Sequence, residues 1–114
     1  MTHVIYAVGD IHGRIDLLSQ LHDHIRDFHQ LQYSDATAEI IYIGDYIDGG
    51  AHSAAVIDLL MEGLKGFQSH HLLGNHEDMM LQCLETDDRD IWHTWLSNGG
   101  EDTLGSLGVS NRFG

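Results

Sequence analysis

Hydrophobic residues follow two patterns that alternate along the chain. Short runs that end at glycine and polar residues, in segments 4–8, 40–43 and 67–73, predict three short strands. After each run, apolar residues recur every three or four positions, the stripe of an amphipathic helix packed on a sheet. The first two stripes are Ile15, Leu18, Leu21, Ile25 and Phe28, and then Val56, Ile57, Leu60, Met61 and Leu64.

The second half of the chain predicts more helix. Met80, Leu81 and Leu84 mark a third helix. A fourth is indicated by Ile91, Trp92, Trp95 and Leu96, and a last short turn of helix by Leu104 and Leu107. Asp16 and Ser53 are predicted at the starts of the first two helices, and residues 33–38 are predicted to form a loop.

Strand and helix alternating three times predict an α/β fold with a mainly parallel sheet and right-handed crossovers. A chain of 114 residues without linker or repeat is expected to form one domain, residues 1–114. Ligands of such sheets bind at the carboxyl ends of the strands, so the polar residues there are the first place to look for function.

Composition narrows the class of protein. With 18 acidic and 5 basic residues the net charge is -13, which argues against nucleic acid or an anionic membrane as a partner. A single cysteine, Cys83, excludes an internal disulfide and fits a reducing compartment. No apolar run approaches membrane-spanning length, so we expect a cytoplasmic protein.

Metal-binding residue types follow the three predicted strands. Asp10 and His12 follow the first, Asp45 the second and Asn75 the third. A carboxylate with an imidazole favours iron, zinc or manganese over calcium. Asp45 has two oxygens with which to bridge two ions, and Asn75 adds an amide oxygen. Two such ions would activate a water for phosphoryl transfer.

Two neighbouring residues supply proton chemistry. His76 is expected to act as the general acid that protonates the leaving oxygen, and Asp48 to orient it and hold it cationic. The structural alternative is that Asp10 and Asp45 are ordinary turn or capping acids. Glu77 is expected to be a first-turn helix acid rather than a ligand.

Three motifs carry a resemblance to a known family. GDIHG at residues 9–13, GDYIDGG at 44–50 and GNHE at 74–77 resemble the signatures of calcineurin-like metallophosphoesterases, above all the bacterial serine/threonine protein phosphatases. WLSNGG at 95–100, followed by TL at 103–104, resembles the same bacterial members. The resemblance implies a phosphorylated protein or small phosphoester as substrate, and two divalent ions (manganese, iron or zinc) as cofactors. It assigns Asp10 and His12 to the first ion, Asp45 to both and Asn75 to the second, with His76 and Asp48 as catalytic residues.

The resemblance also implies what this sequence lacks. The family fold is a four-layer α/β/β/α sandwich, of which the βαβαβα pattern would supply the first half, so we expect an incomplete domain with a missing C-terminal half or with self-association. The later histidines of the family do not occur, which leaves the second metal site incomplete. Gly49 stands where the family has a phosphate-binding arginine, and Arg14 is the candidate substitute.

Two other functions compete with a protein phosphatase. A symmetrical dinucleoside tetraphosphate hydrolase shares these signatures, but its relatives often carry glutamine at the position of His12. A non-catalytic remnant of the fold is the other alternative, favoured by Gly49 and the incomplete second site. On either the phosphatase or the remnant reading, we expect the isolated chain to be weakly active or inactive.

The remaining histidines and aromatic residues have structural interpretations. One of His70 and His71 is expected to face the core and the other a helix. Met79, Met80, Trp92 and Trp95 are expected in the core or in an apolar patch. Surface positions are predicted for His3, His22, His24, His29, His52 and His93.

Overall fold

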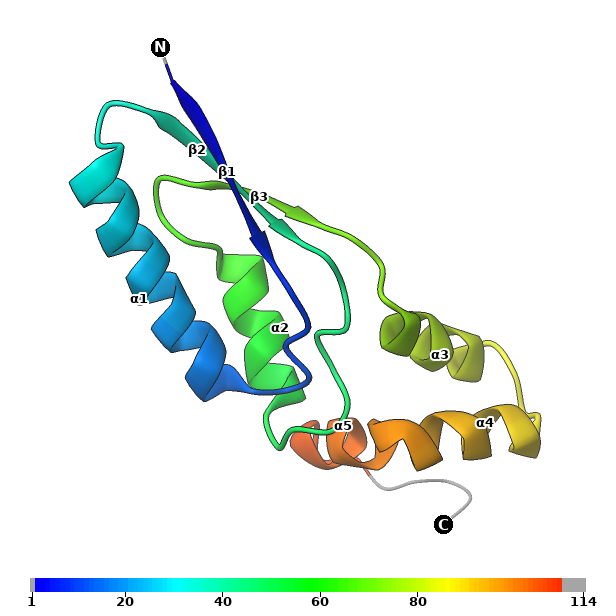
Figure 1. Ribbon diagram of the computed structural model, residues 1–114. Helices are drawn as coiled ribbons and strands as arrows, with labels where there is room; N and C mark the ends of the chain where they lie inside the picture. Colours follow the sequence, from blue (N-terminus) through cyan, green and yellow to red (C-terminus); the bar gives the residue numbers. More distant parts are fainter. Residues whose placement is uncertain (1, 110–114) are drawn as a thin grey trace.

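The computed structural model describes residues 2–109 of the chain. Its first part is a three-stranded sheet with two helices (Figure 1). The elements are β1 (His3–Val8), α1 (Ile15–Gln32), β2 (Thr37–Tyr42), α2 (Ser53–Glu62) and β3 (Gln68–His71).

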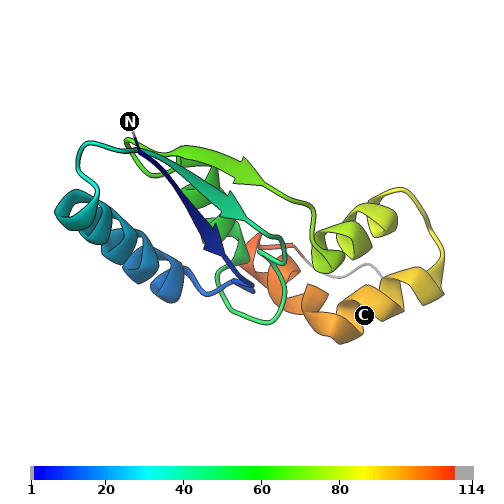
Figure 2. The ribbon, with the colours of Figure 1, turned by 45° about the horizontal axis from the view of Figure 1, so that its top comes forward.

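All three strands are parallel and lie in the order β1-β2-β3. Tyr6 is paired with Ile40, and Ile40 with Ser69. Helices α1 and α2 form the two crossovers and lie against the same face of the sheet, as Figures 1 and 2 show. The α/β class and the parallel sheet predicted from the sequence are confirmed.

Helices make up the second part, beyond the carboxyl ends of the strands (Figure 2). They are α3 (Asn75–Leu84), α4 (Arg89–Trp95), the π-helical turn η1 (Leu96–Gly100) and α5 (Glu101–Ser106). The molecule is elongated, 53 × 21 × 18 Å along its principal axes. None of the helices in residues 2–109 has the length and hydropathy that a membrane span requires.

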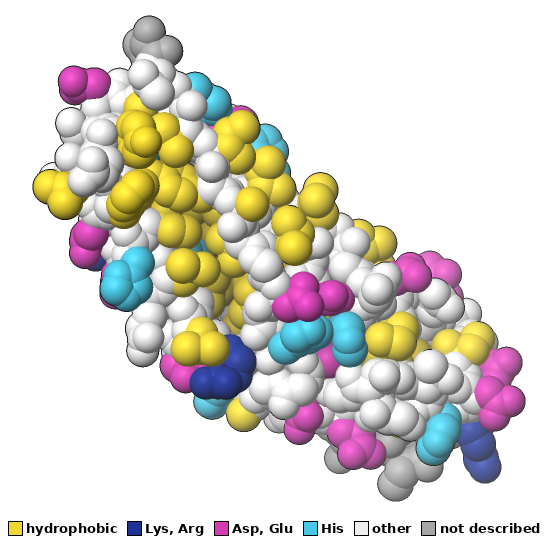
Figure 3. Space-filling view, in the orientation of Figure 1, with side chains coloured by type: hydrophobic (Ala, Val, Ile, Leu, Met, Phe, Trp, Pro, Cys, Tyr) yellow, Lys and Arg dark blue, Asp and Glu magenta, His cyan; other side chains and the backbone are white. Residues whose placement is uncertain are grey.

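The core lies between the sheet and helices α1 and α2, and it continues into the second part of the chain through Cys83, Trp92 and Trp95. Ala38, Ile40 and Tyr42 alternate along β2 and are buried on the helix side. No helix covers the opposite side of the described sheet, where Ile5 remains 55% exposed and Ile43, just after β2, 49% exposed. Figure 3 shows exposed hydrophobic side chains over the sheet and α1.

Helix α1 buries only part of the predicted stripe. Leu18, His22 and Ile25 are buried, whereas Leu21 and Phe28 remain exposed. His22 was predicted at the surface, but it is only 4% exposed, because its Nε2 lies 2.7 Å from the hydroxyl of the buried Tyr42, which needs a polar partner.

Other local predictions were also wrong. Met61 was predicted in the core and is exposed, because the buried stripe of α2 runs through Val56 and Leu60 instead. His70 and His71 are both exposed: His70 pairs with Glu39 on the open sheet face, and His71 stacks on Tyr42 at the edge strand.

Strand β2 begins earlier than predicted, whereas the predicted burial of Trp92 and Trp95 is confirmed. Thr37 and Ala38, assigned to a loop, belong to β2 because they pair with β1. Trp92 and Trp95 are core residues, as predicted.

Candidate functional site

The loops after β1 and β2 are joined to each other by backbone hydrogen bonds. The backbone N–H groups of Ile11 and His12 both donate to the Asp45 carbonyl at 3.0 Å, and that of Gly13 donates to the Tyr46 carbonyl at 2.8 Å. The residues after β1 are therefore held directly against those after β2, as the parallel sheet predicts.

Three candidate residues have a left-handed backbone conformation. His12, Asp45 and Asp48 have φ values of 46°, 57° and 73°, and they are the only residues other than glycine with positive φ in the described chain. This region is unfavourable for residues with a Cβ and persists only where surrounding contacts hold it. Backbone strain is thus concentrated in the loops that carry the predicted site.

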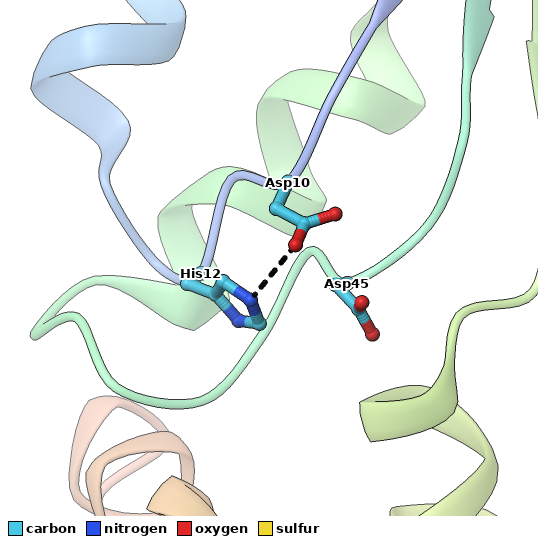
Figure 4. Close-up of side chains that lie close together, drawn as sticks. All are labelled: Asp10, His12 and Asp45. Atoms are coloured by element: carbon cyan, nitrogen blue, oxygen red, sulfur yellow. Dashed lines mark ion pairs between the residues drawn. The ribbon is translucent and has the colours of Figure 1, made fainter.

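Asp10, His12 and Asp45 converge into one cluster. One ligand atom from each lies within 4.8 Å of the others, and His12 Nε2 is 3.5 Å from Asp10 Oδ2 (Figure 4). His12 Nδ1 donates to the Ile47 carbonyl at 3.0 Å, which leaves Nε2 with its lone pair directed into the cluster. Two carboxylates and one oriented imidazole are a suitable donor set for a divalent transition-metal ion.

The electrostatics of the cluster favour a cation. Burial of the ring lowers the pKa of His12, but the hydrogen bond to Ile47 and the charges of Asp10 and Asp45 outweigh burial, so the pKa is raised overall. Figure 3 shows acidic and histidine side chains together near the middle of the visible face.

His76 and Asp48 form a pair beside this cluster. His76 Nδ1 lies 2.9 Å from Asp48 Oδ2, and Asp48 is only 1% exposed. The backbone N–H of His76 donates to Asp45 Oδ1 at 3.0 Å, and the rings of His76 and His12 are 4.8 Å apart between centroids. The structure thus brings together five of the predicted residues, the three of the cluster and the two of this pair. The imidazole of His76 lies next to the cluster of Asp10, His12 and Asp45.

Two further predicted residues lie at the edges of the site. Asn75 is exposed and is the first residue of α3, directly before His76. The exposed guanidinium of Arg14 forms an ion pair with Asp16 at 2.9 Å, so a role in binding phosphate would require that pair to open.

Glu77 has a larger structural role than its sequence position suggested. It does lie in the first turn of α3, but its buried carboxylate also accepts backbone N–H groups from Asp45 at 2.7 Å, Tyr46 at 2.9 Å and Gly74 at 3.0 Å. It joins the loop after β3 to the loop after β2. Burial and the nearby Glu77 charge raise the pKa of Tyr46 to about 12. The spacing of Gly74 and Glu77, that of a helix N-cap and its N3 acid, was the available signal.

Sequence comparison agrees with this geometry. Residues 3–112 match the calcineurin-like phosphoesterase family, and the chain belongs to it. Serine/threonine-protein phosphatase 2 of Escherichia coli K12 is 38% identical over 97 residues, and the Salmonella typhimurium LT2 protein of the same name is 38% identical over 96. Serine/threonine-protein phosphatase BSL2 of Arabidopsis thaliana is 30% identical over 109 residues.

These relatives are longer than this chain. The matches cover 85%, 84% and 78% of this chain but 38%, 38% and 10% of the respective relatives. The chain therefore spans about two-fifths of the length of the two bacterial phosphatases it matches.

Proposed function

We propose that the chain carries the metal-binding part of a phosphoesterase of the serine/threonine protein phosphatase type, which hydrolyses phosphomonoesters. The observation that carries the proposal is the convergence of Asp10, His12 and Asp45 beside the pair of His76 and Asp48. The family membership and the phosphatase names of the relatives support it. The substrate would be a phosphorylated protein or a small phosphoester.

We assign the metal ligands as the sequence predicts. Asp10 and His12 would hold one divalent ion, Asp45 would bridge, and Asn75 would contribute to a second ion. Bound manganese, iron or zinc would activate the attacking water and neutralise charge on the phosphate. The second ion receives only Asp45 and Asn75 from the described residues, and two ligands do not make a tight site.

His76 acts as the general acid in this proposal. Its Nδ1 is hydrogen bonded to Asp48, so Nε2 is the nitrogen that can give a proton to the leaving oxygen. Asp48 fixes the ring orientation and stabilises the imidazolium, as the carboxylate does in a catalytic triad.

Two observations favour a non-catalytic remnant as the second candidate. Gly49 has no side chain with which to bind phosphate, and Arg14 is already paired with Asp16. Together with the two-ligand second site, they lead us to expect weak hydrolysis by the isolated chain. The dinucleoside tetraphosphate hydrolase is disfavoured because the reported relatives are named as protein phosphatases.

Calorimetric titration of Mn²⁺ into the metal-free chain tests the ligand assignment. We expect one binding site, weakened about tenfold or more by Asp45→Asn or His12→Ala. Asp16→Asn, which removes an exposed carboxylate outside the cluster, should leave the affinity unchanged. Two tight sites would refute our inference that the coordination of the second ion is incomplete. Unchanged Mn²⁺ affinity in Asp45→Asn would refute the proposed metal site.

Hydrolysis assays separate the candidate functions. With Mn²⁺ we expect slow release of phosphate from an aryl phosphate. A fast rate abolished by Asp45→Asn would exclude the remnant. Cleavage of a phosphopeptide but not of a dinucleoside tetraphosphate would identify the protein-phosphatase type, and the reverse preference would overturn it.

A further inference from the structure

The buried Asp48 carboxylate has two partners from the C-terminal helices that the catalytic assignment does not use. Trp95 Nε1–H donates to Asp48 Oδ2 at 2.7 Å, and the Thr103 hydroxyl donates to Asp48 Oδ1 at 2.5 Å. The backbone N–H of Asp48 donates in turn to Thr103 Oγ1 at 3.0 Å and to Ser53 Oγ at 3.2 Å. Segments about fifty residues away in the sequence thus bind both the side chain and the backbone of this residue.

These contacts restrict where the carboxylate can point. A buried carboxylate is stable only when donors satisfy its oxygens. With one oxygen held by Thr103 and the other by Trp95, the carboxylate cannot rotate away from His76 without breaking a charge-assisted hydrogen bond. The same contacts hold Asp48 in its left-handed backbone conformation.

A kinked turn between Trp95 and Thr103 allows both side chains to reach Asp48. It forms the π-helical turn η1, kinked at Asn98 and Gly99, where Gly99 has a φ of 104°. A Cβ on Gly99 would lie 2.7 Å from the backbone nitrogen of Gly49, and one on Gly100 would lie 2.5 Å from the Trp95 ring. The two glycines therefore allow the turn to close against the loop that carries Asp48.

We propose that Trp95 and Thr103 are positioning residues of the site: they hold the Asp48 carboxylate in the orientation in which it accepts Nδ1–H from His76 and leaves Nε2 for the substrate. The proposal rests on the proposed function of the His76–Asp48 pair. It gives the WLSNGG segment and the threonine after it a role at the site that the three loop motifs form.

The two tryptophans provide a matched test in the metal-free chain. Trp95→Phe removes the N–H that Asp48 accepts, whereas Trp92→Phe removes an N–H donated to the Thr86 carbonyl at 3.0 Å. Nitrogen-15 NMR of histidine-labelled protein at alkaline pH reports which His76 nitrogen carries the proton. We expect the Nδ1–H tautomer in the wild type and in Trp92→Phe, and loss of this preference, tenfold or more, in Trp95→Phe.

Thr103 provides a second test that does not depend on the folding of Trp95→Phe. Thr103→Val removes the hydroxyl and keeps the shape, and Thr103→Ser restores the hydroxyl. We expect Thr103→Val to lose the tautomer preference and Thr103→Ser to retain it, with unchanged far-ultraviolet circular dichroism. A His76 tautomer unchanged in both Trp95→Phe and Thr103→Val would overturn the proposal.

Activity separates this inference from the proposed function. If the chain hydrolyses an aryl phosphate, Trp95→Phe and Thr103→Val should lower kcat about tenfold or more with KM unchanged. Absence of hydrolysis in the wild type would favour the non-catalytic remnant as the function of this chain, while the tautomer result would still decide whether Trp95 and Thr103 position Asp48.

Discussion

Glu77 is a single residue whose side chain binds the backbone of two loops. The residue is 8% exposed, and its carboxylate accepts N–H groups from two loops. Such hydrogen bonds to a charged group contribute about 1.5–3 kcal/mol each, and a buried donor left without an acceptor costs about 1–3 kcal/mol. The residue therefore couples the position of Asp45 to the start of helix α3.

Replacing Glu77 by glutamine should destabilise the chain measurably. The amide turns N–H donors toward backbone N–H groups, so we expect the free energy of unfolding to fall by about 2–4 kcal/mol and Tm by about 8 °C or more. Thermal denaturation followed by circular dichroism measures this. Asp78→Asn, an exposed change in the same helical turn, should stay within about 0.5 kcal/mol of the wild type. Equal stabilities for the two variants would contradict the bridging role of Glu77.

Contacts between elements explain why the sequence predicted some features and not others. The ends of β1, β2 and β3 were predictable because the strand pattern and the polar residues after each strand are local. The buried face of α1 was not, because Leu17 and Leu21 form one apolar stripe while Leu18 and Ile25 form another, and only packing on the sheet selects between them.

In the candidate site, too, some features were predictable from the sequence and others depend on contacts between distant segments. The convergence of Asp10, His12 and Asp45 follows from parallel topology, which the sequence implied. The hydrogen bonds from Trp95 and Thr103 to Asp48 connect positions about fifty residues apart. No local spacing encodes that contact, although the resemblance of residues 95–104 to bacterial phosphatases had drawn attention to the segment.

The contact of helix α1 with strand β2 should depend on pH through His22. Burial lowers the pKa of His22 against the opposing effect of Asp23, and its ring bonds to Tyr42. His71 and Lys65 line the same cavity as His22. The unfolded chain binds a proton near pH 6.5 while the folded chain binds it only at lower pH, so the unfolding free energy falls as pH drops below about 6.5.

The His22→Gln variant isolates this effect. Glutamine can still bond to the Tyr42 hydroxyl but does not titrate, so the variant should lose less stability than the wild type between about pH 7 and pH 5. The slope difference is at most about 1.4 kcal/mol per pH unit. Urea denaturation at several pH values measures it, with His24→Gln on the exposed side of α1 as control. A slope that His22→Gln leaves unchanged would show that His22 takes up its proton equally in both states.

At the scale of the whole molecule, two properties bear on self-association: an open sheet face on which apolar side chains lie beside the Glu39–His70 ion pair, and a net charge of -13. Ile5, Ile43 and Leu72 are all about half exposed, and no helix covers this side of the described sheet. Exposed apolar faces of this kind favour association, whereas like charge on two copies opposes it. The balance between these terms should therefore shift with ionic strength, because salt screens the repulsion and leaves the apolar contact intact.

We predict reversible self-association through this face. Sedimentation velocity should give a mass near 12.8 kDa for the dilute chain at low salt and a rising average mass as protein and salt concentrations increase. Lysine at Ile5 and Ile43 together should suppress the rise, although it lowers the net negative charge and so weakens the repulsion between copies. Leu31 is an exposed residue of α1, away from this face. Leu31→Lys changes the charge in the same direction and should leave the rise in average mass unchanged. An average mass that stays monomeric at high protein and salt concentrations would contradict association, and one that falls equally in both variants would place the contact elsewhere.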